Sequence, residues 1–160
     1  MSEKTLIVYY SWSGTTTRMA KLLQKITESK LEEIKVSADT FSNDMNKTSE
    51  IANQQIASGD LPEVNKISKL DDYDLILVGS PVWSGQVATP IRSFLKQVGD
   101  FNGKIAQFHT SAGSDDKYEA DFEKLLNGLK VNPGLGMTSG DLSNEKSATA
   151  KLSNWIQELN

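Results

Sequence analysis

Apolar residues along this chain form several nearly continuous runs separated by polar segments. The runs at 5–10, 73–80 and 104–108 are the clearest, and 31–38 is a weaker one. A continuous apolar run is typical of a strand that is covered on both faces, as in a parallel sheet. The segment 130–137 predicts a short last strand.

Between these strands, apolar residues recur at intervals of three and four, the spacing of one face of a helix. The four stripes are Met19, Leu22, Leu23 and Ile26; Ile91, Phe94, Leu95 and Val98; Tyr118, Phe122, Leu125, Leu126 and Leu129; and Leu152, Trp155, Ile156 and Leu159. Thr89 and Pro90 fit an N-cap and a first helical residue. Trp155 fits the core. The polar segment 39–66 predicts a surface excursion that carries one helix.

Strands and helices alternate along the whole chain, which predicts an α/β fold with a parallel sheet and helices on both faces. We expect one domain over residues 1–160, because no repeat or linker interrupts this alternation. Ligands of such sheets bind beyond the carboxyl ends of the strands. The loops 11–16, 80–86 and 109–116 each follow a predicted strand, so they are the places where we expect a site.

Composition excludes several classes of site. There is no cysteine and only one histidine, His109, so disulfides, iron–sulfur clusters and a dedicated transition-metal site are not expected. A net charge of -4 argues against a nucleic-acid partner. No apolar run reaches the roughly 20 residues of a membrane span, and the start lacks the pattern of a secretory signal. We therefore expect a cytoplasmic protein without a membrane or nucleic-acid partner.

The first loop is unusually rich in hydroxyl groups. The stretch "YYSWSGTTTRMA" at 9–20 leads from the first strand into the first helix. A helix that starts near Gly14 presents unpaired N–H groups and the positive end of its dipole, which favours an anion. The hydroxyls of Ser11, Ser13, Thr15 and Thr16 add neutral donors there. Because the loop has no lysine, it suits a phosphate that stays bound, as in a cofactor.

Other phosphate loops fit this stretch poorly. It lacks the Gly-Lys-Ser/Thr ending of a P-loop and the G-x-G-x-x-G of a dinucleotide loop. A plain capped helix start remains an alternative, but one or two hydroxyls would suffice for it. The glycines of "GLGMTSG" at 134–140 follow the last predicted strand and are weak evidence of any function.

The stretch "SWSGTT" at 11–16 resembles the [Ser/Thr]-x-[Ser/Thr]-Gly-x-Thr phosphate loop of the flavodoxins, and it follows the first strand as theirs does. "GSPVWSGQVATPIRSFL" at 79–95 and "FHTSAGS" at 108–114 resemble their second and third loops. The chain is most similar to the short bacterial flavodoxin-like branch whose first loop reads Tyr-Ser-Trp-Ser-Gly. The resemblance covers essentially the whole chain.

This resemblance implies FMN as the cofactor and a three-layer fold with an open five-stranded parallel sheet of order 2-1-3-4-5. The phosphate would be held by the first loop, the flavin ring by the second, and its pyrimidine end by the third. The cofactor-binding residues so implied are Ser11, Trp12, Ser13, Gly14, Thr15 and Thr16; Pro81, Val82, Trp83, Ser84 and Gly85; and Ser111, Ala112, Gly113 and Ser114. No catalytic residue and no metal ligand is implied.

Several of these residues also have purely structural interpretations. Trp83 is the candidate for stacking on the flavin, because an indole in a turn would otherwise be exposed, but it could instead pack against neighbours. Trp12 either covers the cofactor or packs beside the helix. His109 is expected to be a strand-end residue satisfied by the backbone rather than a catalytic acid. Arg18 and Lys21 are expected to be solvated, near the phosphate.

The resemblance implies a one-electron carrier that works between redox partner proteins, a reductase and an acceptor. Two departures keep an alternative open: the charge of -4 is modest for a flavodoxin, and the third loop has no tyrosine or tryptophan to cover the other face of the flavin. The alternative is an FMN-dependent NAD(P)H:quinone-type oxidoreductase on the same fold. A binding module without redox turnover is a third interpretation.

Overall fold

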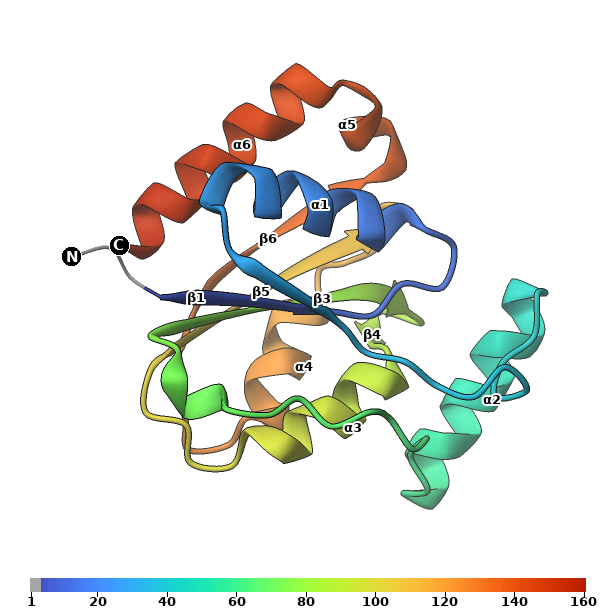
Figure 1. Ribbon diagram of the computed structural model, residues 1–160. Coiled ribbons are helices and arrows are strands. Elements are labelled where there is room, and N and C mark those ends of the chain that lie inside the picture. Colours follow the sequence, from blue (N-terminus) through green and yellow to red (C-terminus); the bar gives the residue numbers. More distant parts are fainter. Residues whose placement is uncertain (1–3) are drawn as a thin grey trace.

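A computed structural model describes residues 4–160 and contains one central, mainly parallel sheet (Figure 1). Its strands are β1 Thr5–Tyr9, β2 Lys30–Glu33, β3 Leu75–Trp83, β4 Gln86–Val87, β5 Lys104–Ser111 and β6 Val131–Thr138. The parallel order is β2-β1-β3-β5-β6, and the two-residue β4 pairs antiparallel with the end of β3. Counting only the parallel strands in chain order, this is the predicted order 2-1-3-4-5, which is therefore confirmed.

Helices cover both faces of the sheet. They are α1 Thr15–Thr27, α2 Met45–Ser58, the short 3₁₀ helix η1 Leu70–Asp72, α3 Thr89–Val98, α4 Tyr118–Leu125, α5 Ser139–Ser143 and α6 Glu145–Leu159. Figure 1 shows α1, α5 and α6 above the sheet, α3 and α4 below it, and α2 projecting from the side beyond α3. The predicted surface excursion therefore carries its helix, α2, at the margin of the fold.

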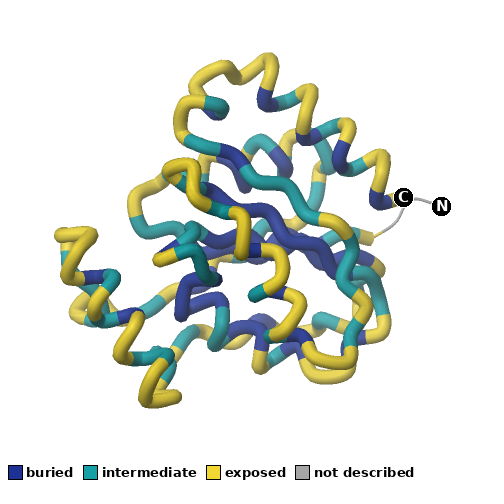
Figure 2. The backbone as a smooth tube through the Cα atoms, turned by 180° about the vertical axis from the view of Figure 1, so that it is seen from behind, coloured by how far each residue is buried: buried dark blue, intermediate teal, exposed yellow. Residues whose placement is uncertain are grey.

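Side chains alternate between the two faces of the sheet and so build two cores. Val8, Val78 and Ile105 point toward α3 and α4, whereas Leu77 and Phe108 point toward α1 and α6. Figure 2 shows the central strands buried and α2 largely exposed. Burial on both faces explains why the strand sequences are continuously apolar. Trp155 is 4% exposed and lies in the α1/α6 core, as predicted.

Element boundaries differ from the sequence prediction in three places. β2 is only four residues long and ends at Glu33. Beyond its end, the N–H of Lys35 donates to the side chain of Asn65. β3 and β5 run three residues further than predicted, because they pair with each other up to Pro81 and Thr110 and their last residues pair with β4 and β6.

Thr89 is not an N-cap. It lies inside α3, with Ala88 in the cap position, and its hydroxyl donates to Oε1 of Gln55 at 2.6 Å. This bond fastens α2 to the start of α3. The prediction failed because the hydroxyl has a tertiary partner on a distant segment, which sequence spacing cannot reveal.

The middle of the sheet depends on one close approach. Gly79 of β3 lies opposite Phe108 of β5, and a Cβ atom at position 79 would lie 2.2 Å from Cζ of the Phe108 ring. The aromatic ring therefore occupies the space that any side chain at position 79 would need. Both strands carry loops of the predicted site at their carboxyl ends, so this contact lies in the strand pair that positions those loops.

We expect Gly79→Ala to lower the free energy of unfolding by about 1–3 kcal/mol, because the Phe108 ring must shift in a close-packed core. Urea denaturation followed by tryptophan fluorescence measures this change. Gly140→Ala is the matched control, because the nearest atom to its new Cβ is at 3.6 Å. Equal stability of the two variants would contradict the packing argument.

Candidate functional site

A pocket of about 250 Å³ lies at the carboxyl edge of the sheet, where the three predicted loops meet. We call it the three-loop pocket. Its lining is Trp12, Ser13 and Thr15 from the first loop and α1, Pro81, Val82 and Trp83 from the end of β3, Thr110, Ser111 and Ala112 from the end of β5, and Met45 and Ser139 from the starts of α2 and α5. Residues far apart in the sequence therefore converge on one concave surface.

The N-terminus of α1 contributes hydrogen-bond donors to this edge. Gly14 precedes the helix with φ 99°, and no side chain caps it. The first amides of such a helix point outward without intrahelical partners, at the positive end of the dipole. Ser11 Oγ accepts the N–H of Gly14 at 3.0 Å, and the hydroxyls of Ser13 and Thr15 lie 3.3 Å apart. The arrangement suits an anion bound by neutral donors.

Thr16 has a different position from the other hydroxyls of this loop. Its side chain is buried, and its hydroxyl lies 2.7 Å from that of Thr110 on β5. This hydrogen bond ties the start of α1 to the end of β5. Thr16 can therefore serve an anion through its backbone N–H, while its side chain aligns two of the three loops.

The two basic residues on α1 do not line the pocket. Arg18 is exposed and donates to the carbonyl of Leu142. Lys21 is exposed, as predicted.

Trp12 joins the first loop to the excursion that precedes α2. Its indole N–H donates to the carbonyl of Ser42 at 3.0 Å, and its half-buried ring packs against the α3/α4 core. Trp12 lines the three-loop pocket. It also lines a neighbouring groove of about 360 Å³, together with Ser11. Both interpretations of this residue, packing and cofactor contact, are thus compatible with its place.

Trp83 is buried rather than exposed. It is the last residue of β3, its exposed fraction is 5%, and it meets Tyr10 and Phe41 edge-on at centroid distances of 5.7 and 5.0 Å. The expectation of an otherwise exposed indole in a turn was wrong, because Phe41 from the excursion covers it. Edge-on packing of this kind holds an aromatic ring in place. Trp83 therefore gives the pocket a rigid wall.

The turn after Trp83 is tight. Ser84 and Gly85 both have positive φ, 53° and 77°, as in the two-residue hairpin turns that join antiparallel strands. A left-handed conformation costs a serine more than a glycine. Since Ser84 still adopts it, the surrounding contacts must hold the hairpin in this shape.

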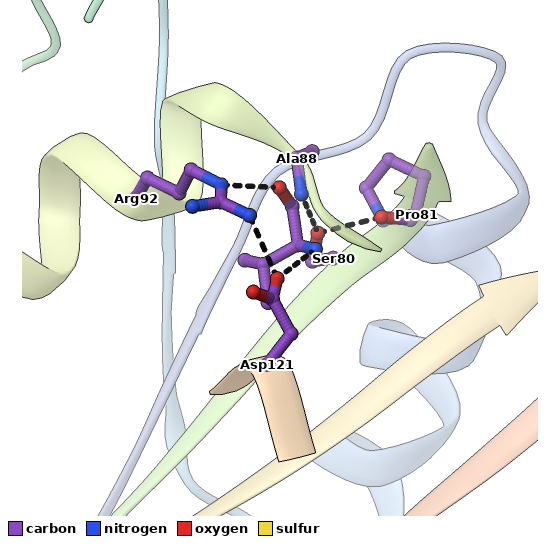
Figure 3. Close-up of polar contacts among 6 residues, drawn as sticks. Ser80, Pro81, Ala88, Arg92 and Asp121 are labelled. Atoms are coloured by element: carbon purple, nitrogen blue, oxygen red, sulfur yellow. Dashed lines mark hydrogen bonds and ion pairs between the residues drawn. The ribbon is translucent and has the colours of Figure 1, made fainter. Parts of the chain in front are cut away.

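A polar clamp supplies those contacts (Figure 3). Asp121 of α4 accepts the N–H of Val87 at 2.9 Å and Nη2 of Arg92 at 2.7 Å, and Arg92 Nε donates to the carbonyl of Val87 at 2.9 Å. The side chains of Arg92 and Asp121 are only 10% and 18% exposed. Behind them, Ser80 Oγ accepts the N–H of Ala88 at 3.1 Å and donates to the carbonyl of Pro81.

The third loop is anchored through side chains. Ser111 Oγ accepts the N–H of Gly113 at 3.2 Å, and Gly113 has φ 120°. The preceding His109 has no backbone partner for its ring, contrary to expectation. Its Nδ1 lies 2.7 Å from Gln107 Oε1 and its Nε2 lies 2.8 Å from Asp115 Oδ2. The backbone around His109 is paired with β3 and β6. The imidazole therefore finds its hydrogen-bond partners among side chains.

The pocket gathers part of the predicted set and adds residues that the sequence analysis missed. The predicted residues outside its lining are Ser11, Gly14, Thr16, Ser84, Gly85, Gly113 and Ser114. The residues missed are Met45, Thr110 and Ser139. Met45 is the one large hydrophobic residue of the described chain that is exposed, at 37%, but exposure has no signature in a sequence. Thr110 lies beyond the predicted end of its strand.

The described residues contain neither a candidate metal site nor a candidate membrane-spanning helix. Within residues 4–160 no three histidine, cysteine, aspartate or glutamate side chains are grouped to hold a metal ion. No helix in the same range is long and apolar enough to cross a membrane.

Comparison with known proteins identifies relatives of the whole chain. The family model described as Flavodoxin matches residues 4–159. A crystal structure of a flavoprotein from Lactobacillus acidophilus in complex with FMN is 44% identical, covers 92% of this chain and 99% of that one, and superposes with a TM-score of 0.80. The NMR structure of the apo form of the flavoprotein from this organism is 46% identical over 90% of this chain and 97% of that one, with a TM-score of 0.68.

A more distant relative is an enzyme by name. The NAD(P)H dehydrogenase (quinone) of Azorhizobium caulinodans is 28% identical over 119 residues, which are 69% of this chain and 57% of that enzyme. This chain therefore spans little more than half the length of that relative.

We expect Asp121→Asn to lower the free energy of unfolding by roughly 2–4 kcal/mol, because Arg92 would lose the charge of its largely buried partner. Glu32→Gln is the control, since Glu32 pairs with Lys30 on the exposed side of β2, where a pair contributes less than about 1 kcal/mol. Urea denaturation measures both changes. A loss at Asp121 no greater than that at Glu32 would show that the clamp does not stabilise the hairpin.

Proposed function

This chain belongs to the flavodoxin family, and we propose that it binds FMN in the three-loop pocket and transfers electrons singly between a reductase and an acceptor protein. The observation that carries this proposal is the convergence of an uncapped helix N-terminus and three strand-end loops on one pocket. The similar flavoprotein from Lactobacillus acidophilus that was crystallised with FMN supports the choice of cofactor.

The residues present fit the phosphate of FMN. Ser11 Oγ already accepts a bond from Gly14, so its own hydroxyl proton is free to be donated to a phosphate oxygen. Ser13 and Thr15 share one bond, which leaves one of their two protons free. With the outward amides of Thr15 and Thr16, these groups make a donor set without a formal charge. Among residues 4–160, no lysine or arginine lines this pocket.

The wall of the pocket beyond the phosphate site is suited to a flat aromatic ring. Trp12, Trp83, Met45 and Val82 provide apolar surface, and burial of that surface favours binding. The isoalloxazine ring supplies the one- and two-electron redox chemistry when FMN is bound. In this proposal, Ser111 and Ala112 with the following Gly113 and Ser114 offer N–H and hydroxyl groups to its pyrimidine end.

The Ser84–Gly85 turn is proposed to lie beside N5 of the flavin. Gly85 has no Cβ, so its peptide group can change orientation at little cost. Such a change lets a backbone group either accept or donate a hydrogen bond when the protonation of N5 changes. The Arg92–Asp121 clamp limits the movement to the turn itself, because it holds Val87 in place.

An NAD(P)H:quinone-type oxidoreductase is the second candidate. The relative named NAD(P)H dehydrogenase (quinone) favours it. So does the side of the pocket formed by Ser111, Ala112 and Ser139, whose small side chains leave space beside the ring for a substrate. A purified protein that binds FMN but exchanges electrons with neither class of partner would support a binding module instead.

We expect Ser13→Ala and Thr15→Val to weaken FMN binding about tenfold or more each, because a hydrogen bond to a charged group contributes about 1.5–3 kcal/mol. The quenching of FMN fluorescence during titration measures the dissociation constant. Ser147→Ala is the control, because Ser147 is exposed on α6. Unchanged affinity in both loop variants would contradict the phosphate site, and a wild-type protein that binds no FMN would overturn the proposed cofactor.

The two redox functions are distinguished by the electron donor. For a carrier, we expect the FMN-loaded protein to consume NAD(P)H slowly in the presence of a quinone, and to be reduced rapidly once a flavodoxin reductase is added. Absorbance at the NAD(P)H band measures consumption. Rapid turnover with NAD(P)H and quinone alone would instead establish the oxidoreductase.

A further inference from the structure

A polar cluster of buried Gln107, buried His109 and partly exposed Asp115 lies beneath the third loop, and the proposed function does not use it. His109 is 6% exposed, and its two ring nitrogens lie 2.7 Å from Gln107 Oε1 and 2.8 Å from Asp115 Oδ2. The ring of Tyr118 covers the imidazole at a centroid distance of 4.4 Å. A buried, fully hydrogen-bonded imidazole on a mainly apolar strand calls for a reason beyond packing.

The neighbouring strand leaves space for this cluster. Gly136 of β6 lies opposite His109, and a Cβ atom there would be 2.1 Å from His109 Nε2 and 2.8 Å from Asp115 Oδ2. A Cβ atom on Gly134 would be 2.0 Å from Gln107 Nε2. Both glycines of "GLG" at 134–136 thus accommodate the polar side chains. This space is the physical role of a motif that the sequence analysis left without a function.

Asp115 connects the cluster to the loop. Its carboxylate reaches back to His109 on β5, while its carbonyl accepts the N–H of Tyr118 at the start of α4. At the other end of the loop, Ser111 Oγ accepts the N–H of Gly113. The segment 111–114, which we propose for the pyrimidine end of FMN, is therefore held between two anchors. One of these anchors depends on the imidazole.

The cluster has two hydrogen-bonded states that differ by one proton. With Gln107 Oε1 and Asp115 Oδ2 both facing the ring, the imidazole donates from both nitrogens and is positively charged. A neutral ring that keeps its proton on Nε2 still donates to Asp115, and then the Gln107 amide must turn to donate to Nδ1. The second state has no charged pair, so it holds Asp115 less strongly.

Burial, and after it the charged groups around His109, decide which state prevails. Asp115 and Glu119 favour the charged ring, whereas burial, the larger effect, lowers the pKa of His109 below its ordinary value of 6.5. Tyr118 stays neutral, since burial raises the pKa of its hydroxyl. The neutral ring thus dominates at neutral pH. The charged ring therefore forms only at pH values below 6.5.

We propose that His109 is a positioning residue for the flavin: through Asp115 it holds residues 111–114 in the conformation that contacts the ring, and it does so more firmly when protonated. This inference rests on the proposed binding of FMN in the three-loop pocket. Its sign is definite: the added affinity for FMN is present at mildly acidic pH and is lost as the pH rises through the pKa of His109.

A first experiment needs no FMN, because the chain contains a single histidine. NMR titration of the wild type follows the ring of His109 and the amides of residues 111–114. We expect the loop amides to shift with the same midpoint as the ring. In Asp115→Asn, which keeps an acceptor but removes the charge, the pKa of His109 should fall. Loop amides that do not follow the ring, or a pKa of His109 unchanged by Asp115→Asn, would overturn the inference.

A second experiment measures the dissociation constant of FMN between pH 5.5 and 8. Asp115→Ala should weaken binding about three- to tenfold, as expected for the loss of one hydrogen bond. Asp115→Asn should match the wild type at pH 8 and bind less tightly than it below pH 6. Asp116→Ala, in the same exposed loop, is the control for lost charge.

The outcomes of these experiments separate the two proposals. Equal affinities in Asp115→Ala and Asp116→Ala would overturn the positioning role while leaving FMN binding intact. A wild type that binds no FMN would overturn the proposed function, and the NMR titration would still decide whether His109 anchors the loop. The phosphate of FMN also titrates in this pH range, but it does so with wild type and variant alike. Comparing their dissociation constants at each pH therefore cancels its contribution.

Discussion

The parallel pairing of β3 between β1 and β5 is the constraint on which the rest of this structure depends. These ladders bring the carboxyl ends of three strands to one edge, and each strand ends in a loop of the candidate site. Gly79 leaves the space that the Phe108 ring fills on one face of this pair. Both faces of these strands are covered, so a change in register would expose apolar side chains and separate the loops.

Polar contacts between distant segments then give each loop its shape. Thr16 bonds Thr110, the Arg92–Asp121 clamp holds the β3–β4 hairpin, and His109 holds Asp115. The Thr16–Thr110 contact is buried and the Arg92–Asp121 contact largely so, and hydrogen bonds are stronger in such surroundings than at the surface. The Asp115 side chain, at 40% exposure, is more open to solvent. These contacts connect the loops of the candidate site to neighbouring strands and helices.

The excursion that leads into α2 contributes to the candidate site and is not only a surface segment. Trp12 donates to Ser42, Phe41 packs against Trp83, and Met45 reaches the pocket. A polar, weakly periodic segment thus supplies an apolar wall next to the proposed ring of FMN. Gln55 further along α2 accepts the hydroxyl of Thr89 and so fastens this wall to α3.

The sequence by itself determined the fold, its strand order through the flavodoxin resemblance, and the three loops that meet at the candidate site. The fold class and the loops follow from local features: continuous apolar runs, helical stripes, and hydroxyls next to a glycine at a helix start. Tertiary structure alone decided that Trp83 is buried, that Thr16 faces Thr110, that Thr89 serves Gln55 and that His109 meets Asp115. In each of these contacts, the folded packing of the chain determines which residues become neighbours. Hydroxyl, indole and imidazole groups fit several environments equally well, so spacing along the chain does not select among them.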